Sequence, residues 1–297
     1  MLRCRSCSRV STLSLSCFSN PRAIATLQAI FAVPILAFTP AMERLRKIIA
    51  NPQANEPEIL WAASAAYFVE EPPLNDKGSL KFVFGVQHDA LEFLECVLEA
   101  VERLEHNKAK LEINVTTTHT CDKCMRAANI PPAKDNVLYV YLPKPQPKGT
   151  HRLETLLNGS SSPTEKKWCE TCGENVAGVQ VVNSQTSEVL IICLKRFDFS
   201  GKGFKICTNI VTPLELNFQG KTYRLRSQVD HIGTTIKSGH YITHKMVGAE
   251  FVTISDMKVN KPRGNVLESK QSYLLFYSEV KAGEVHIPSC FLFFNSS

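Results

Sequence analysis

The chain has 297 residues, enough for one large domain or two ordinary ones with a substantial core. Its 44% hydrophobic and 21% charged residues are typical of a folded globular protein and exclude a wholly disordered chain. The formal net charge of +6 is mild, without the concentrated basic stripe of a nucleic-acid-binding protein. We therefore expect no nucleic-acid partner.

The first 40 residues are unusual because they contain arginines, many serines and three cysteines but no acidic residue. This composition resembles a mitochondrial transit peptide, and the alternative is a poorly ordered or wrongly assembled N-terminus. The longest apolar run, Ala23 to Phe38, is interrupted by Gln28 and Pro34 and is shorter than the ~20 residues that a membrane span needs. We expect no membrane span.

Helical patterns dominate the first hundred residues. The apolar run from Ala23 to Phe31 predicts a helix that ends near Pro34, and a second helix is expected at about 41–50. The clearest pattern runs from about His88 to Glu105, where leucine and valine recur at helical spacing between acidic residues.

Four of the eleven cysteines form two Cys-x-x-Cys pairs, Cys121 with Cys124 and Cys169 with Cys172. Each pair places two thiolates on a tight turn, and together they supply the four soft ligands that tetrahedral zinc prefers. A redox pair and unrelated buried cysteines are the alternatives. We predict a closed structural zinc site, since no ligand position is left for water, and a reducing compartment.

The region 113–182 reads as an extended β subdomain around this metal. After it, six β-like runs predict a largely antiparallel sheet: 189–197, 206–211, 223–229, 240–247, 251–254 and 273–277. A turn near Gly248 would bring Ser255 or Asp256 back beside His240. An acceptor in this place can orient a histidine that acts as a general base, although a purely structural histidine is the alternative.

Five segments in this order resemble the ubiquitin-specific protease family, and the match spans about Leu27 to Tyr277. They are Gln87 to Leu94, the two cysteine pairs, Val189 to Phe197, the block from His231 to Tyr241, and Ser272 to Tyr277. The resemblance implies an α+β, papain-like cysteine protease fold. It has a helical thumb (25–112), zinc-bearing β fingers (113–187) and an antiparallel β palm (188–297), after an atypical N-terminus (1–24).

The resemblance also implies a thiol-dependent deubiquitinase whose partners are ubiquitin and ubiquitinated proteins in the cytoplasm or nucleus. By position His240 corresponds to the catalytic base, and Ser255, followed by Asp256, stands where the family carries Asp or Asn. A hydroxyl can accept the imidazole N–H bond but stabilises imidazolium less than a carboxylate does. The residues that the resemblance assigns to ubiquitin binding are Gln87, Asp89, Phe93, His231, Gly239 and Tyr241.

The family's nucleophilic cysteine has no clear counterpart. Counting back from Leu27 puts its position on Pro21, and Cys17 lies four residues upstream. A thiol at a helix start gains acidity from the helix dipole, which Cys17 would lose unless the intervening residues bulge out. Three interpretations stay open: a wrongly assembled N-terminal exon, which we favour, a distorted site around Cys17, and a catalytically silent ubiquitin-binding scaffold.

Overall fold

The computed structural model describes residues 21–34, 36, 43, 46–47, 89–102, 104–143, 149–158, 162–163, 167–176, 178–185, 187–199, 203–236, 238–255, 258–262 and 264–281. Its helices are α2 (Pro21–Ile30), α5 (Ala90–Glu102), α6 (Glu105–Leu111) and α7 (Leu153–Asn158). The strands up to the second cysteine pair and its sheet are β1 (Ile113–Cys121), β2 (Ala127–Asp135), β3 (Leu138–Tyr141), β4 (Thr150–Arg152), β5 (Ser162–Pro163), β6 (Lys167–Cys169), β7 (Glu174–Val176) and β8 (Gly178–Gln185). The remaining strands are β9 (Val189–Lys195), β10 (Phe197–Asp198), β11 (Phe204–Lys205), β12 (Asn209–Val211), β13 (Glu215–Phe218), β14 (Lys221–Ile232), β15 (His240–Val247), β16 (Glu250–Ser255), β17 (Lys258–Asn260), β18 (Glu268–Ser269) and β19 (Ser272–Glu279).

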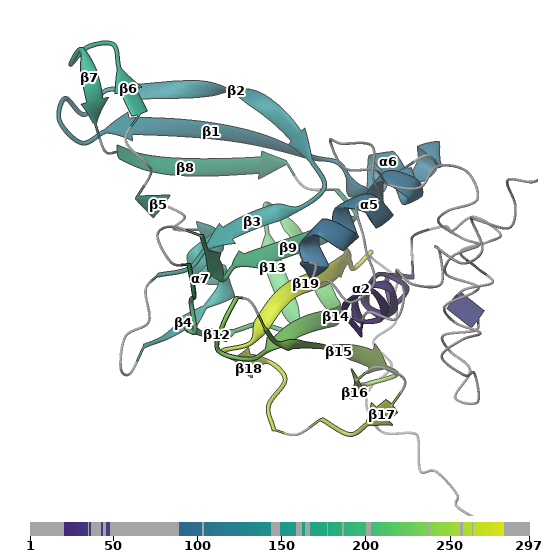
Figure 1. Ribbon diagram of the computed structural model, residues 1–297. Coiled ribbons are helices and arrows are strands. Elements are labelled where there is room, and N and C mark those ends of the chain that lie inside the picture. The colour runs from purple at the N-terminus through teal and green to yellow at the C-terminus, as the bar shows by residue number, and fades with distance from the viewer. Residues whose placement is uncertain are drawn as a thin grey trace, which may run out of the picture.

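The centre of the molecule is a twisted eight-stranded sheet, called here the palm sheet (Figure 1). Its order is β17-β16-β15-β14-β19-β9-β3, with β13 paired to β14. All pairs are antiparallel except β3 with β9. The predicted antiparallel palm is therefore confirmed for the body of the sheet, with one parallel strand added at its edge.

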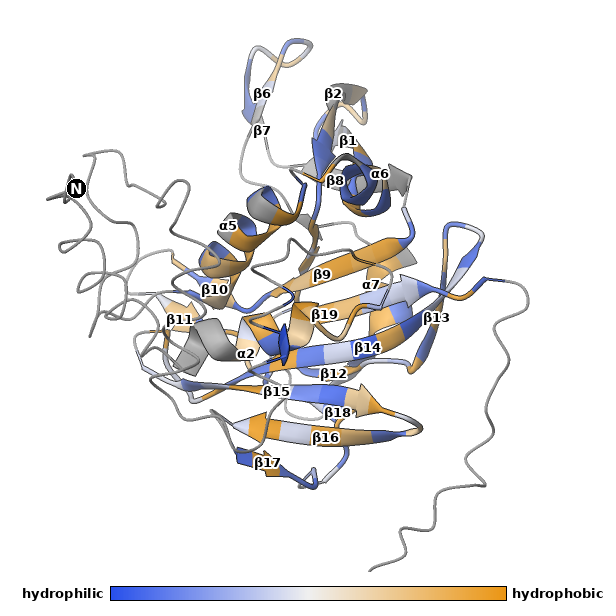
Figure 2. Ribbon diagram, turned by 90° about the vertical axis from the view of Figure 1, so that its right-hand side faces the viewer, coloured by the Kyte–Doolittle hydropathy of each residue, from blue (hydrophilic) through white to orange (hydrophobic). Residues whose placement is uncertain are grey.

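Both faces of the palm sheet are covered, so β9 is apolar almost throughout, as its orange colour in Figure 2 shows. Side chains of a strand alternate between faces, so Ile191 and Cys193 enter one core while Ile192 and Leu194 enter the other. The first core contains the inner sides of α2 and α5. The second lies on the opposite face, beneath α7 and β12.

Hydroxyl groups of the palm sheet hold helix α2 in place. Ser227 Oγ donates to the carbonyl of Ala29, and Thr243 Oγ1 donates to the carbonyl of Ala25, each at 2.7 Å. Both hydroxyls are buried, so these bonds fix the helix at one height and angle on the sheet. The β15 strand that carries His240 is thereby tied to the start of the chain's described part.

Strands β1, β2, β8 and β5 form a separate antiparallel sheet, called here the finger sheet, in the order β2-β1-β8-β5. It projects away from the palm and carries the β6–β7 hairpin at its tip (Figure 1). The β1–β2 ladder shifts between Val115 and Thr117, opposite Pro131 and Pro132. Proline has no N–H to donate, so the two prolines sit at this bulge on an edge strand.

Several elements differ from the sequence-based expectation. The helix expected from about His88 to Glu105 is α5, which ends at Glu102, and a further short helix, α6, begins at Glu105 and was not expected. Most of the helix expected at 41–50 lies outside the described residues. Residues 138–158 interrupt the expected finger range: β3 joins the palm sheet, and β4 pairs with β12 beside it.

A buried arginine joins three segments at the end of β9. The Arg196 side chain has no exposed surface, and its guanidinium donates to the carbonyls of Ile206 at 3.0 Å and Thr208 at 2.9 Å. It also donates to the carbonyls of Ser269 and Ser272 and to the Ser272 hydroxyl. Burial lowers the pKa of Arg196 to about 10, so the group stays charged at neutral pH and all of these bonds are charge-assisted.

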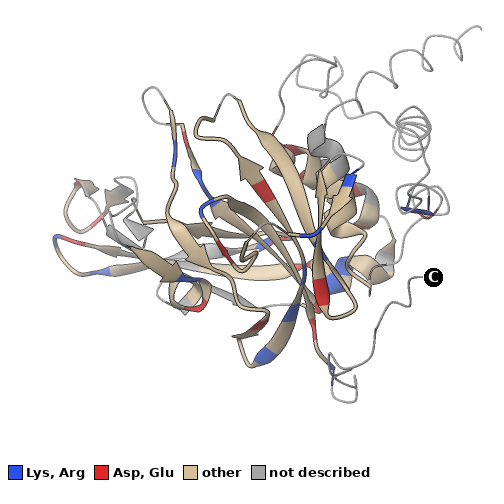
Figure 3. Cartoon of the chain, turned by 90° about the horizontal axis from the view of Figure 1, so that it is seen from below, with Lys and Arg blue, Asp and Glu red and all other residues tan. Residues whose placement is uncertain are grey.

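In the described part of the chain, no helix has the length and apolar character needed to cross a membrane. Basic and acidic residues are interspersed along the strands in Figure 3. This distribution agrees with the mild net charge.

Candidate active site and metal centre

His240 and Ser255 meet across the hairpin formed by β15 and β16. The ladder pairs Thr243 with Ile254, which places Ser255 diagonally opposite the first residue of β15. His240 Nε2 lies 2.9 Å from Ser255 Oγ, and the tautomer of the ring decides which of the two donates. The hydroxyl therefore fixes one ring nitrogen of a partly exposed histidine.

Gly239 gives His240 its position because the ring of His231 packs directly against it. A Cβ at Gly239 would lie 2.1 Å from His231 Nε2 and 2.8 Å from the carbonyl oxygen of Ile232. Only glycine leaves room for this contact.

Asp89 is the residue before helix α5, and it caps the helix. Its Oδ1 accepts the backbone N–H of Leu91 at 2.8 Å and the hydroxyl of Tyr273 at 2.7 Å. Burial raises the pKa of Tyr273 well above its usual value, which keeps the phenol protonated as a donor. Asp89 thus joins α5 to the palm sheet at the edge of the site.

Three residues assigned to ubiquitin binding by resemblance are interior. Phe93 is 8% exposed, His231 1% and Tyr241 2%. The ring of His231 lies between Phe197 and Tyr241, with centroid distances of 5.0 and 4.8 Å. As the structure has them, these side chains shape the site from within and offer little surface to a partner.

The other expected site residues fall outside the described part of the chain. These are Gln87, Asp256 and the candidate nucleophile Cys17. Helix α2 begins at Pro21, the residue on which the counting from Leu27 had placed the nucleophile. Proline suits the first turn of a helix, where its missing N–H costs nothing, but it has no nucleophilic atom.

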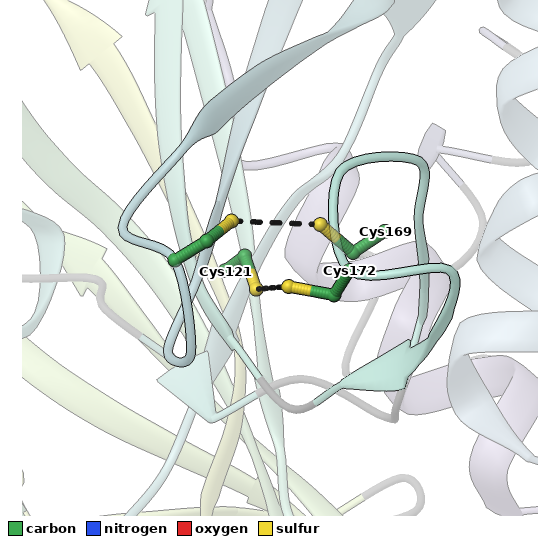
Figure 4. A group of neighbouring side chains, drawn as sticks. Cys121, Cys169 and Cys172 are labelled. Carbon is green, nitrogen blue, oxygen red and sulfur yellow. Dashed lines mark hydrogen bonds between the residues drawn. The ribbon is translucent and has the colours of Figure 1, made fainter.

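The four paired cysteines come together at the tip of the finger sheet (Figure 4). Their sulfur atoms lie within 4.8 Å of one another, with Cys121 and Cys172 at 3.8 Å and Cys124 and Cys169 at 3.6 Å. A disulfide requires a much shorter distance, about 2.05 Å. Tetrahedral zinc with bonds of about 2.3 Å would separate its sulfurs by roughly 3.8 Å, so the cluster fits a metal ion of this kind.

The two cysteine turns have the same backbone geometry. The N–H of Met125 donates to the carbonyl of Cys121 at 2.8 Å, and the N–H of Gly173 donates to that of Cys169 at 2.9 Å. Both residues have positive φ, 58° at Met125 and 65° at Gly173. Glycine adopts this conformation freely, whereas a methionine rarely does. The backbone N–H of Cys172 lowers the pKa of Cys169, whereas burial raises the pKa of Cys172, so these neighbouring thiols do not both ionise readily without a cation beside them.

Comparison with known proteins identifies the family. The family model for "Ubiquitin carboxyl-terminal hydrolase" matches residues 74–277, well over half of the chain. The chain belongs to the ubiquitin carboxyl-terminal hydrolase family. The resemblance inferred from the five sequence segments is thereby confirmed.

Two curated relatives are also ubiquitin carboxyl-terminal hydrolases. Ubiquitin carboxyl-terminal hydrolase 26 of Arabidopsis thaliana is 24% identical over 270 residues, which is 79% of this chain and 24% of that protein. Ubiquitin carboxyl-terminal hydrolase 10 of Saccharomyces cerevisiae is 29% identical over 132 residues, which is 40% of this chain and 17% of that protein. The chain thus spans a quarter or less of the length of these relatives.

Solved structures of the same family share the fold. A structure of the SAGA Ubp8/Sgf11/Sus1/Sgf73 DUB module bound to ubiquitin aldehyde matches with a TM-score of 0.60 and 18% identity, covering 93% of this chain and 71% of that one. A structure of the module bound to monoubiquitin matches with a TM-score of 0.60 and 19% identity, covering 92% of this chain and 70% of that one. The predicted α+β, papain-like fold is confirmed.

This member of the ubiquitin carboxyl-terminal hydrolase family has a second histidine network that the sequence analysis missed. His244 Nδ1 lies 2.9 Å from Thr253 Oγ1, and His244 Nε2 lies 3.6 Å from Asp230 Oδ2. With Ser255, His244 and Asp230 line a cavity of about 740 Å³. His244 follows His240 by four residues on one strand, so the period of two places both on one face of β15. That spacing is the one signal of this network in the sequence.

Proposed function

We propose that this chain is a deubiquitinase that removes ubiquitin from protein conjugates, with residues 25–297 as its catalytic domain. The observation that supports this most directly is the pair formed by His240 and Ser255, held at 2.9 Å on the family's palm sheet. The matched structures include modules bound to ubiquitin aldehyde and to monoubiquitin. Ubiquitin is therefore the proposed partner.

In this mechanism His240 takes the proton from the attacking thiol, and the thiolate adds to the carbonyl carbon of the last residue of ubiquitin. The bond to the substrate amine then breaks, and His240 returns the proton to that amine. Water attacks the resulting thioester, with His240 again as base, and releases the ubiquitin carboxylate and the thiol. We propose that Ser255, aided by the neighbouring carboxylate of Asp256, orients the imidazole of His240. Cys17 is the proposed nucleophile.

A catalytically silent ubiquitin-binding scaffold is the second candidate, and the start of α2 favours it. The helix begins at Pro21, where the family places its nucleophile, and Cys17 lies four residues upstream of that position. A thiol so displaced would lose the acidity that a helix start gives it. The domain could then hold ubiquitin without cleaving it.

Ubiquitin that carries a thiol-reactive group at its C-terminus separates the two candidates. We expect a covalent adduct on Cys17, mapped by mass spectrometry, whose rate of formation falls by roughly 10²–10⁴-fold in His240→Ala, because the base is lost. His106→Ala, at an exposed histidine on α6, is the control and should react at the rate of the unmodified chain.

Two other outcomes of this labelling experiment would also distinguish the candidates. Noncovalent binding without an adduct supports the scaffold and rejects the enzyme. No binding of ubiquitin in any form contradicts both.

We also propose that the cysteine cluster holds a structural zinc ion. Four thiolates complete a tetrahedral shell, so the ion would hold the two turns together and leave no position for water or substrate. The ligands would be Cys121, Cys124, Cys169 and Cys172, in agreement with their sulfur–sulfur distances. Cysteines outside disulfides persist in a reducing compartment. We therefore propose that the protein is located in the cytoplasm or nucleus.

Replacing Cys121 with serine should release one equivalent of zinc per chain, measured by elemental analysis. Hydrogen exchange should accelerate in β6, β7 and the adjacent ends of β1 and β8, because these strands meet at the cluster, while β9 and β19 keep their protection. The control is Cys207→Ser, at a partly exposed cysteine outside the cluster. Unmodified chain that contains no stoichiometric zinc would contradict the proposed site.

A further inference from the structure

Lys205, the last residue of β11, is a buried cation directly beside the candidate active site. It is 6% exposed, and its ammonium donates three hydrogen bonds. Two go to the backbone carbonyls of His231 at 2.5 Å and Gly233 at 2.8 Å, and the third goes to Gln271 Oε1 at 2.5 Å. The ammonium thus joins the end of β14 to the turn before β19.

The three partners of Lys205 are neutral, which makes the position costly. An ammonium taken out of water is compensated only partly by carbonyl dipoles, but removing it would leave three oxygen acceptors without this donor. The charged and titratable groups that face it are Arg196, Cys207 and Asp230. Burial, aided by the charge of Arg196 and opposed by Cys207 and Asp230, lowers the pKa of Lys205 to about 8.

The bonded carbonyls flank the residue that pairs with His240. Ile232 stands between His231 and Gly233, and the β14–β15 ladder pairs it with His240. A Cβ placed on Gly233 would lie 3.1 Å from the Cα of Gly239, and one placed on Gly239 would lie 2.1 Å from His231 Nε2. The two residues that Lys205 holds are therefore those that pack against the backbone preceding His240.

The turn before β19 belongs to the same arrangement. The N–H of His231 donates to the carbonyl of Gln271 at 2.9 Å, while Lys205 bonds the side chain of Gln271. An ammonium offers three N–H donors in tetrahedral directions, so one atom can hold carbonyls that approach from different segments. A neutral amide or a planar guanidinium cannot reproduce those directions.

We propose that Lys205 is a positioning residue for His240. It fixes the carbonyls of His231 and Gly233, these residues fix Gly239, and Gly239 sets the imidazole in reach of Ser255. The inference rests on the proposed role of His240 as the base. It assigns to Lys205 a part in orienting the ring and no contact with the substrate.

The test compares Lys205→Met with Lys221→Met. Lys221 is the first residue of β14, at the end of that strand away from His231, and its ammonium bonds Glu279 at 3.0 Å, so the control removes a hydrogen-bonded cation far from His240. The readout is the imidazole ¹⁵N spectrum of His240, which reports the tautomer and the order of the ring without requiring catalysis. We expect ring signals averaged between tautomers in Lys205→Met and signals of the unmodified chain in Lys221→Met.

Where the chain cleaves a ubiquitin conjugate, Lys205→Met should lower kcat by roughly 10²-fold with little change in KM, the size expected when a reacting group is displaced by about 1 Å. Unchanged ring signals in a folded Lys205→Met chain would overturn the proposal.

If Lys205→Met does not fold, a pH titration of the unmodified chain followed by NMR tests the proposal instead. The ¹³Cε signal of Lys205 should titrate with a midpoint near pH 8, and the amide signals of Gly233 and Gly239 should shift with the same midpoint, because a neutral amine has only two N–H donors for three acceptors. Glycine amides that stay unchanged while Lys205 titrates reject the proposal. A chain that fails to bind ubiquitin but shows this coupling contradicts only the proposed function, so the two can fail separately.

Discussion

Replacing Arg196 with methionine is expected to lower the free energy of unfolding by about 3–5 kcal/mol, the cost of breaking a buried and fully bonded charged group. Methionine fills much of the volume but donates nothing. The carbonyls of Ile206, Thr208 and Ser272 would then lose their charge-assisted donor at a site with no exposed surface. Each buried acceptor left without a partner costs about 1–3 kcal/mol, so water entry or a shift of these segments would recover only part of the loss.

Urea unfolding followed by circular dichroism measures the effect, and Arg224→Met is the matched control. Arg224 lies on β14 and bonds the partly exposed carboxylate of Glu215 at 2.6 Å. An ion pair of this kind contributes about 0–1 kcal/mol, so the control should unfold almost like the unmodified chain. If both variants lose less than about 1 kcal/mol, the buried guanidinium does not join these segments as the structure indicates.

Local patterns predicted much of the fold because they report which face of an element is buried. The leucines and valines of α5 recur at helical spacing and do enter the core. The apolar run at β9 did predict a strand, and its lack of alternation agrees with a sheet covered on both faces. The turn at Gly248 was enough to bring Ser255 beside His240, because an antiparallel hairpin fixes its own register.

Long-range contacts account for most of what the sequence did not reveal. Arg196 and Lys205 read as ordinary exposed cations in a local pattern, and their acceptors lie up to 76 and 66 residues away in the chain. In the chain, β3 is separated from β9 by the elements from β4 to β8, so nothing in residues 138–141 alone predicts a parallel partner in β9. These contacts follow from the topology of the fold, which local sequence patterns do not specify.

The cysteine cluster shows the opposite case, in which spacing was informative. Two Cys-x-x-Cys pairs predicted a common site across 44 residues, and their sulfurs do meet. The positive φ of Met125 was not predictable from its residue type, because glycine or asparagine is usual there. The first turn adopts the conformation of the second because both must direct two sulfurs at one point.

The contact of Gly239 with His231 leads to the second large expected effect. A methyl group here cannot be accommodated by a small movement, because the ring of His231 is held between two aromatic rings and the carbonyl of Ile232 is backbone. Overpacking a well-packed core costs about 1–3 kcal/mol. The strain is relieved where the chain is least confined, at the partly exposed residue that follows Gly239, so His240 moves away from Ser255.

We therefore expect Gly239→Ala to slow His240-dependent labelling by ubiquitin with a thiol-reactive C-terminus by roughly 10²-fold, since a 1 Å displacement of a reacting group can have this effect. Gly220→Ala is the control: Gly220 lies in the turn between β13 and β14, has φ of 75°, and its added Cβ would meet no atom within 4 Å, so it costs backbone strain alone. His231→Ala would open space for the methyl group, so the double variant should be less impaired than the two single effects combined predict. Strictly additive effects in this cycle would show that the methyl group acts on His240 by a route other than the ring of His231.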